Sequence, residues 1–219
     1  WGIEMFKKAK LLIAAASVSV CALAAAPASA AFFSGFEGDA GLSNGQWTVM
    51  SPSFDGWNVI SGPGIEVQNG NVGGTTAYEG NQKVELDSHG GQNTNSRMEQ
   101  TVSLSAGRYQ FSFAYFGRTG DTGTNGIGYS LAPGVLDVSN VTGVKAAGWT
   151  IISHMFTLNA DTDVTMAFWA DGKDDTLGGY LDNVRISAVP LPPAVMLFGA
   201  ALAGLGWLGR RRKGSALTS

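Results

Sequence analysis

Apolar and polar residues alternate along several stretches in the middle of this 219-residue chain. The clearest stretch is 109–115, where four aromatic residues occupy every second position. In a second stretch, Val164, Met166 and Phe168 alternate with Thr165 and Ala167. A period of two places successive side chains on opposite faces of a β-strand. The middle of the chain is therefore predicted to form β-sheet with one apolar face.

Further strand-like stretches recur between glycine- and asparagine-rich turns, and no amphipathic helical pattern interrupts them between residues 32 and 188. These other predicted strands are 46–50, 57–60, 65–68, 82–87, 97–104, 126–131, 149–158 and 180–187. About ten strands without helices predict an all-β fold. We expect residues 31–188 to form a single antiparallel jelly-roll β-sandwich.

The N-terminal residues have the pattern of a secretion signal, after an upstream remnant of residues 1–4. Three lysines within residues 7–10 precede an apolar stretch at 11–26. Ala28 and Ala30 then give the small-x-small pattern that signal peptidase reads. The sequence predicts a signal peptide at residues 5–30 that is cleaved after Ala30.

The C-terminal residues have three parts in a fixed order: a proline motif, an uncharged apolar stretch and a basic cluster. The motif is Val189, Pro190, Leu191 and Pro192, and the basic cluster includes Arg210, Arg211 and Arg212. A helix over 194–209 would span about 24 Å, slightly less than a hydrocarbon core of about 30 Å. Basic residues remain on the cytoplasmic side of a membrane. We therefore expect a transmembrane helix that leaves the domain outside and residues 214–219 as a cytoplasmic tail.

Residues 189–213 resemble the PEP-CTERM sorting signal in its Val-Pro-Leu-Pro variant. The resemblance implies that an exosortase cleaves the chain near the proline motif after signal peptidase has acted. It also implies transient anchoring in the inner membrane, followed by release to the cell surface or extracellular matrix of a Gram-negative bacterium that makes exopolysaccharide. The cleavage position stays open, because Pro193 extends the motif.

The domain between the two targeting segments is acidic and lacks thiols. Residues 31–188 contain 16 Asp and Glu against 7 Lys and Arg. This excess disfavours nucleic-acid partners and anionic membrane surfaces. Cys21 is the only cysteine and is lost with the signal peptide, which excludes disulfides and thiolate metal sites in the mature protein.

Four blocks of sequence occur in the order Phe54–Trp57, Gly80–Asp87, Phe111–Arg118 and Leu177–Val184. Together they resemble the galactose-binding-domain-like β-sandwiches of secreted bacterial proteins. That resemblance implies a carbohydrate-binding module with one structural Ca²⁺ between its first and last strands. Glu37 and Asp182 match the acidic metal-binding positions, and calcium takes such oxygen ligands. For Asp182 the alternatives are a surface carboxylate or an ion pair with Arg185.

Aromatic rings stack on sugar rings, and polar side chains bind the hydroxyl groups. On this basis Trp57, Trp169, Tyr180 and Arg118 are the candidate ligand-binding residues. Aromatic residues at strand spacing are more often part of the core. For Arg118 the alternative is a structural ion pair with a buried carboxylate, Glu85 or Asp87.

Nothing in the sequence indicates an enzyme. His89 and His154 are the only histidines, and no nucleophile, zinc-binding or phosphate-binding motif accompanies them. Our first hypothesis is a non-catalytic surface protein that binds glycan or has a structural role in the exopolysaccharide of a biofilm. A second hypothesis is an adhesion or assembly protein without a sugar site. A third, with least support, is a secreted polysaccharide hydrolase.

Overall fold

The computed structural model describes residues 30–89, 93–132, 134–190, 198–202 and 204–205. The chain divides into two compact units, Pro27–Pro190 and a second one that joins Trp1–Ala26 with Leu191–Ser219. In the second unit, residues 198–202 and 204–205 are helical. Within the described ranges, no helix is both long and apolar enough to cross a membrane. The predicted signal peptide before Ala30, the motif residues Leu191 and Pro192, and the arginines at 210–212 lie outside the described residues.

The first unit is built from β-strands. Its described residues form β1 (Ala30–Ser34), β2 (Trp47–Met50), β3 (Ser53–Phe54), β4 (Trp57–Ser61), β5 (Ile65–Asn69), β6 (Gln82–Glu85), β7 (Arg97–Leu104), β8 (Gly107–Phe116), β9 (Ile127–Ala132), β10 (Leu136–Val141), β11 (Thr150–Leu158), β12 (Thr162–Ala170) and β13 (Tyr180–Ala188). A 3₁₀-helix, η1 (Lys145–Ala147), precedes β11.

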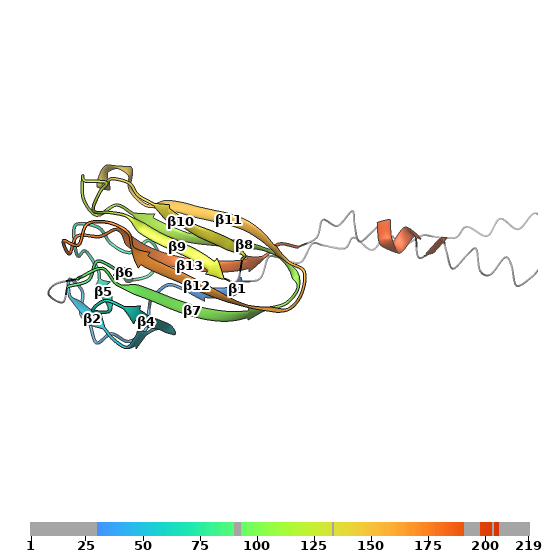
Figure 1. Ribbon diagram of the computed structural model, residues 1–219, viewed down its shortest axis with the longest axis horizontal. Helices are drawn as coiled ribbons and strands as arrows, with labels where there is room; N and C mark the ends of the chain where they lie inside the picture. The colour runs from blue at the N-terminus through green and yellow to red at the C-terminus, as the bar shows by residue number, and fades with distance from the viewer. Residues whose placement is uncertain (1–29, 90–92, 133, 191–197, 203, 206–219) are drawn as a thin grey trace, which may run out of the picture. The chain divides into compact units, whose positions relative to one another are not determined.

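The strands form two sheets that pack against each other (Figure 1). The seven-stranded sheet has the order β11-β8-β13-β6-β5-β2, with β1 also paired to β13, and the six-stranded sheet has the order β10-β9-β12-β7-β4-β3. All pairings between these strands are antiparallel. The prediction of an all-β antiparallel sandwich is confirmed, and the two sheets are consistent with a jelly roll.

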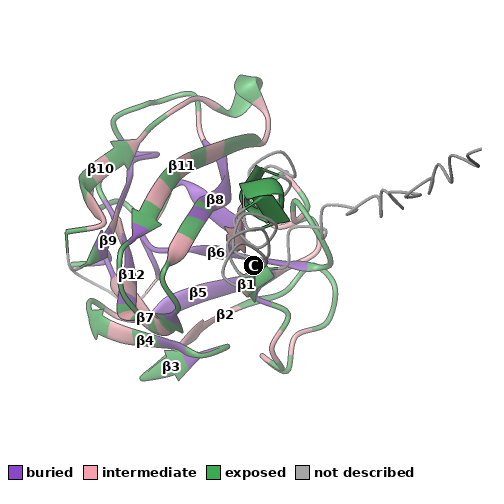
Figure 2. Ribbon diagram, turned by 90° about the vertical axis from the view of Figure 1, so that its right-hand side faces the viewer, coloured by how far each residue is buried: buried purple, intermediate pink, exposed green. Residues whose placement is uncertain are grey.

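The alternating aromatic residues of the sequence form the core between the sheets. On β8, all four of Tyr109, Phe111, Phe113 and Tyr115 are buried. On β12, Val164, Met166 and Phe168 are buried as well, and the rings of Phe113 and Phe168 meet edge to face at 5.1 Å. Figure 2 shows this difference in burial, with buried residues along β8 and largely exposed or intermediate residues along the edge strands β10 and β11. Burial of these alternating rings holds the two sheets together.

Strand β13 has two partners on one of its sides. Its first residues, Tyr180 and Leu181, pair with β6, and the part from Val184 onward pairs with β1. The register of β13 shifts between Asp182 and Arg185, and Asn183 has a positive φ of 54°. A bulge of this kind re-aims neighbouring side chains. Asp182 therefore lies where β6 ends along β13 and β1 begins.

The structure contains strands that the sequence pattern did not predict. The N-terminal strand β1, the two-residue strand β3 and the edge strand β10 were all missed. β10 carries polar residues at several positions and no fully buried one, so it lacks a clear apolar face. An edge strand is more exposed to solvent than a central strand. Its apolar and polar residues therefore alternate less clearly, and prediction from sequence depends on that alternation.

Candidate functional site

Two of the four predicted ligand-binding residues are completely buried. Trp57 belongs to the core, where its ring lies 5.6 Å from that of Phe168 and its indole N–H donates to Ser34 Oγ at 3.1 Å. Tyr180 lies on the outer side of the seven-stranded sheet, covered by the connection between β5 and β6. A Cβ at Gly73 of that connection would be only 1.8 Å from the Tyr180 hydroxyl. Neither aromatic ring has a surface free for a ligand.

Arg118 belongs to a buried group of side chains that we call the ionic cluster. Its members are Glu66, Gln68, Lys83, Glu85 and Arg118. Arg118 Nη1 donates to both carboxylate oxygens of Glu85 at 2.7 Å, and Gln68 Nε2 bridges Glu85 and Glu66 at 2.9 and 2.8 Å. Glu66 and Gln68 alternate with core residues of β5, so the cluster lies on the outer side of its sheet. Arg118 therefore has the structural role that the sequence offered as its alternative.

Lys83 fastens the connection between β5 and β6, residues 70–81, over the ionic cluster. Its ammonium group donates to the carbonyl oxygens of Gly70, Val72 and Thr75 at 3.3, 3.1 and 3.0 Å. Burial lowers the pKa of Lys83 from 10.5 to about 8. Burial raises the pKa of Glu85 well above its usual value, against the opposing effect of Arg118. A buried ammonium group and a largely buried guanidinium thus offset two buried carboxylates beneath this connection.

The two predicted calcium ligands hold the far end of the same connection. Glu37 Oε1 accepts hydrogen bonds from the backbone N–H groups of Asn81 and Gln82 at 2.7 and 2.8 Å. Asp182 Oδ2 accepts from the backbone at positions 78 and 79, at 2.8 and 3.1 Å. Burial raises the pKa of Asp182 to about 6, backbone donors oppose this, and the charge of Glu37 adds to the rise. The two carboxylates are therefore near each other, and both accept hydrogen bonds from the backbone of one segment, residues 78–82.

Arg185 does not pair with Asp182, which was one alternative from the sequence. Its guanidinium donates to Glu79 Oε2 at 2.6 Å and to Asn183 Oδ1 at 2.6 Å. Asp182 is instead satisfied by the backbone of the 78–82 segment and by the N–H of Asn183. The ion pair of Arg185 adds a third hold on this segment.

The contacts of Glu37 and Asp182 can be compared with what the Ca²⁺ ion implied by the sequence resemblance requires. Ca²⁺ takes six to eight oxygen ligands, whereas backbone N–H groups surround these two carboxylates. Across the described part of the chain, no group of three or more His, Cys, Asp or Glu side chains is arranged to hold a metal. The surroundings of the two residues therefore do not fit a calcium ion.

We expect the thermal unfolding midpoint of the protein to be the same in excess CaCl₂ and in excess EDTA. The physical reason is that Glu37 Oε1 and both carboxylate oxygens of Asp182 already accept hydrogen bonds from N–H donors. Differential scanning calorimetry of the full chain measures this. A midpoint that rises in calcium, and no longer does so in Glu37→Gln, would establish the predicted site instead.

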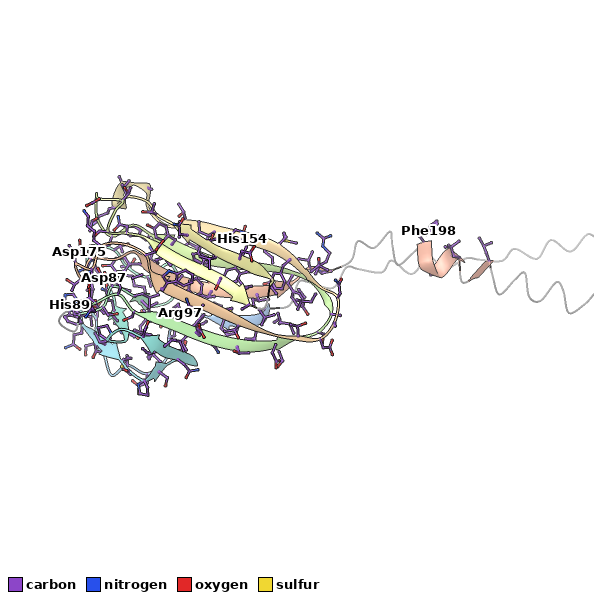
Figure 3. All side chains as sticks on the ribbon, in the orientation of Figure 1. Asp87, His89, Arg97, His154, Asp175 and Phe198 are labelled. Carbon is purple, nitrogen blue, oxygen red and sulfur yellow. The ribbon has the colours of Figure 1, made fainter. Side chains whose placement is uncertain are left out.

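Carboxylates also tie together the connections at one end of the sandwich, where Figure 3 shows Asp87, His89 and Asp175. Asp87 Oδ2 accepts from the backbone N–H groups of Asp175 and Leu177 at 3.1 and 3.0 Å. The hydroxyl of Thr94 contacts both Asp87 and Asp174. The acidic segment 171–175, which superficially resembles a calcium loop in sequence, connects β12 to β13 and is fixed by these contacts.

Trp169, the fourth predicted ligand-binding residue, lies on the outer side of the six-stranded sheet. Its neighbours Phe168 and Ala170 are buried, so its own side chain points away from the core. The indole covers Gly128 of β9, where a Cβ would come within 2.1 Å of the ring. The guanidinium of Arg97 lies over the ring, with its carbon 4.8 Å from the ring centroid. Trp169 is partly exposed, which separates it from Trp57 and Tyr180.

Polar side chains surround this indole on the same face of the sheet. Arg97 Nε and Nη2 both donate to Glu99 Oε1, at 2.9 and 2.7 Å, which fixes the guanidinium beside the ring. Asn58 of β4 pairs in register with Glu99, and the hydroxyls of Thr101 and Thr165 meet at 2.8 Å. We call this surface the tryptophan face, defined by Asn58, Arg97, Glu99, Thr101, Thr165 and Trp169. Figure 3 marks Arg97 on the sandwich.

The neighbours of Trp169 were not predicted from the sequence. Arg97, Glu99 and Thr101 alternate with the buried Met98 on β7, so they share the outer face of that strand. The alternation of outward and buried residues along β7 could be read from the sequence, but the pairing of β7 with β12 could not. Strand pairing is what places Arg97 opposite Trp169.

No protein-family model matches the sequence, and no curated protein matches it. Several solved carbohydrate-binding modules are similar in structure. TmCBM61, solved with beta-1,4-galactotriose, is 19% identical with a TM-score of 0.47, and the match covers 64% of this chain and 92% of the module.

The CBM22-2 xylan-binding domain of Paenibacillus barcinonensis Xyn10C is 16% identical with a TM-score of 0.44, over 73% of this chain and 100% of that domain. The module CBM6cm-2 from Cellvibrio mixtus lichenase 5A, solved with cellotriose, is 16% identical with a TM-score of 0.38, over 74% and 99%. TM-scores below 0.5 assign the chain to none of these modules, and the fold and the site rest on the geometry above.

Proposed function

We propose that this chain is an exported surface protein whose β-sandwich binds polysaccharide through the tryptophan face. One observation carries the proposal: an outward-facing indole fixed between Gly128 and the Arg97–Glu99 pair, with hydroxyl and amide groups around it. The part of the indole that neither Gly128 nor Arg97 covers supplies an apolar surface for the C–H groups of a sugar ring. Asn58, Glu99 and the two threonines supply partners for its hydroxyl groups.

The arrangement suits binding without catalysis. The carboxylate of Glu99 is held by Arg97, and Glu85 is buried in the ionic cluster. The indole needs no rearrangement of its strand, because β12 is paired on both sides. A rigid site that is already in its binding geometry lowers the entropic cost of binding. The ligand supported best is a polysaccharide chain lying along this face.

Trp169→Ala is expected to weaken polysaccharide binding about 30-fold, because truncating a central aromatic residue of an interface costs about 2 kcal/mol. The measurement is a polysaccharide array, followed by affinity electrophoresis, with the purified full-length chain. Trp47→Ala is the matched control, since Trp47 is an exposed tryptophan on β2 of the other sheet. Equal binding by wild type and Trp169→Ala would contradict the proposal. An array without any bound glycan would favour the adhesion hypothesis.

The route to the surface is the second half of the proposal and rests on the sequence. The signal peptide at 5–30 and the sorting signal at 189–213 support cleavage by signal peptidase and by an exosortase. In cells with exosortase, we expect the intact mass of the external protein to correspond to a chain from Ala31 to a residue within 189–194. In cells without the enzyme, that truncated mass should be missing. Persistence of the apolar C-terminal stretch in both would show a permanent anchor instead.

A further inference from the structure

A surface hollow beside the other sheet is lined by several asparagine residues. It has a volume of about 420 Å³ and lies between the turn before β2 and the 70–81 connection. Asn44, Asn69, Asn71 and Asn81 line it together with Thr76. Its volume is in the range of small-molecule sites. We call it the asparagine pocket.

Backbone hydrogen bonds fix the walls of the asparagine pocket. Gly45 N donates to Asn69 O at 2.8 Å, and Gly70 N donates to Asn81 O at 2.8 Å. Glu37 holds the N–H of Asn81 at 2.7 Å, and Lys83 holds the carbonyl of Gly70. The pocket therefore exists because of the carboxylate of Glu37 and the buried ammonium of Lys83, and it needs little ordering before it binds.

Three of the four side-chain amides are free, although the backbone that carries them is fixed. Asn69 Nδ2 donates to Leu42 O at 3.2 Å. In the described ranges, the side chains of Asn44, Asn71 and Asn81 make no hydrogen bond within the protein. Each carboxamide offers two N–H donors and one carbonyl acceptor. Three exposed asparagines with unused amides, which offer both kinds of hydrogen-bonding group, thus lie around one hollow.

The chemistry of the lining selects a neutral ligand with many hydroxyl groups. Among the residues that the structure describes, no charged side chain lines the asparagine pocket, and the nearby Glu37 adds a negative charge at its edge. Anions are therefore disfavoured, and a cation would find no carboxylate in the lining. A hydroxyl group is at once donor and acceptor, as is a carboxamide. Ala77 adds a small apolar contact for the C–H groups of a ring.

We propose that the asparagine pocket binds one neutral saccharide residue, at a chain end or branch, independently of the tryptophan face. The two sites belong to different sheets: the pocket lies beside β2, β5 and β6, and the tryptophan face is formed by β4, β7 and β12. A domain with both sites holds two glycan segments at once and cross-links them. The cross-linking role rests on the proposed function of the tryptophan face, whereas the pocket itself does not.

The test uses the full-length chain and a panel of neutral methyl glycosides, with glucuronic acid as the charged probe, measured by calorimetry. Asn71→Ala/Asn81→Ala removes two of the free amides and keeps all backbone hydrogen bonds. Its matched control is Asn159→Ala, an exposed asparagine in the connection between β11 and β12. Thermal unfolding midpoints confirm that all variants fold. We expect at least one neutral glycoside to bind wild type, Asn159→Ala and Trp169→Ala alike, and about tenfold more weakly to the double variant.

Three results would overturn the proposal that the asparagine pocket binds a neutral saccharide. They are no binding of any neutral glycoside to wild type, equal binding by the double variant, or tighter binding of glucuronic acid than of any neutral probe. Failure of the proposed function looks different. Polysaccharide binding would then survive Trp169→Ala and be lost in Asn71→Ala/Asn81→Ala. Of the two sites tested, only the asparagine pocket would then bind glycan.

Discussion

Arg118→Met is expected to lower the free energy of unfolding by about 3–5 kcal/mol, because it leaves a buried carboxylate without its cation. Glu85 has no exposed surface and receives both short hydrogen bonds from Arg118 Nη1. Methionine approximates the volume of the arginine stem, so the loss is mainly electrostatic. Chemical denaturation of the purified chain, followed by near-UV circular dichroism, measures the change.

The double variant Glu85→Met/Arg118→Met separates the missing charge from the missing volume. It should recover most of the lost stability, since removing both members of a buried pair is often close to neutral. Lys173→Met is the matched control, because the Lys173–Asp121 pair is exposed on both sides and should contribute nothing measurable. If Arg118→Met were as stable as wild type, the buried ion pair would not have the structural role assigned here.

Trp57→Ala should destabilise the protein by about 3–5 kcal/mol and leave the glycan affinity of the folded fraction unchanged. The indole of Trp57 is fully buried and packs against Phe32, Phe36 and Phe168 at centroid distances of 6.1, 5.9 and 5.6 Å. Its N–H donates to Ser34 of β1, so this residue also connects the six-stranded sheet to the seven-stranded one. Denaturation and affinity electrophoresis on one preparation measure both properties.

Trp169→Ala is the counterpart, with the opposite expected pattern. Its indole lies outside the core, so the variant should keep most of its stability and lose binding. If Trp57→Ala lost binding and kept its stability, Trp57 rather than Trp169 would be the ligand contact. The pair of variants thus distinguishes a core residue from a ligand contact on neighbouring parts of one sheet.

The core was predictable because its alternation is strong. On β8 four aromatic residues point inward, and on β12 the sequence Val164, Met166 and Phe168 does the same. Burying these rings contributes more than any local propensity. The same alternation places Trp169 outside, one residue after Phe168, so its exposure followed from the sequence.

The burial of Tyr180 on the outer side of its sheet did not follow from the sequence. A strand pattern predicts that side chains on this side are solvent-exposed. The 70–81 connection covers the Tyr180 ring and is held by hydrogen bonds from Lys83 that join residues with no periodic relation. The asparagine pocket escaped prediction for the same reason, since Asn44, Asn69 and Asn81 come together only through the turn before β2 and the pairing of β5 with β6. The ion pair of Arg118 with Glu85, in contrast, was one of the alternatives that the sequence offered.

The most direct test of the account is an NMR titration of the tryptophan indole N–H groups with the polysaccharide fragment that the array identifies. The chain contains six tryptophans, each with one such resonance. The account predicts that the Trp169 resonance shifts in proportion to saturation while that of Trp57 stays in place. A saturating titration that leaves Trp169 unshifted would contradict glycan binding at the tryptophan face.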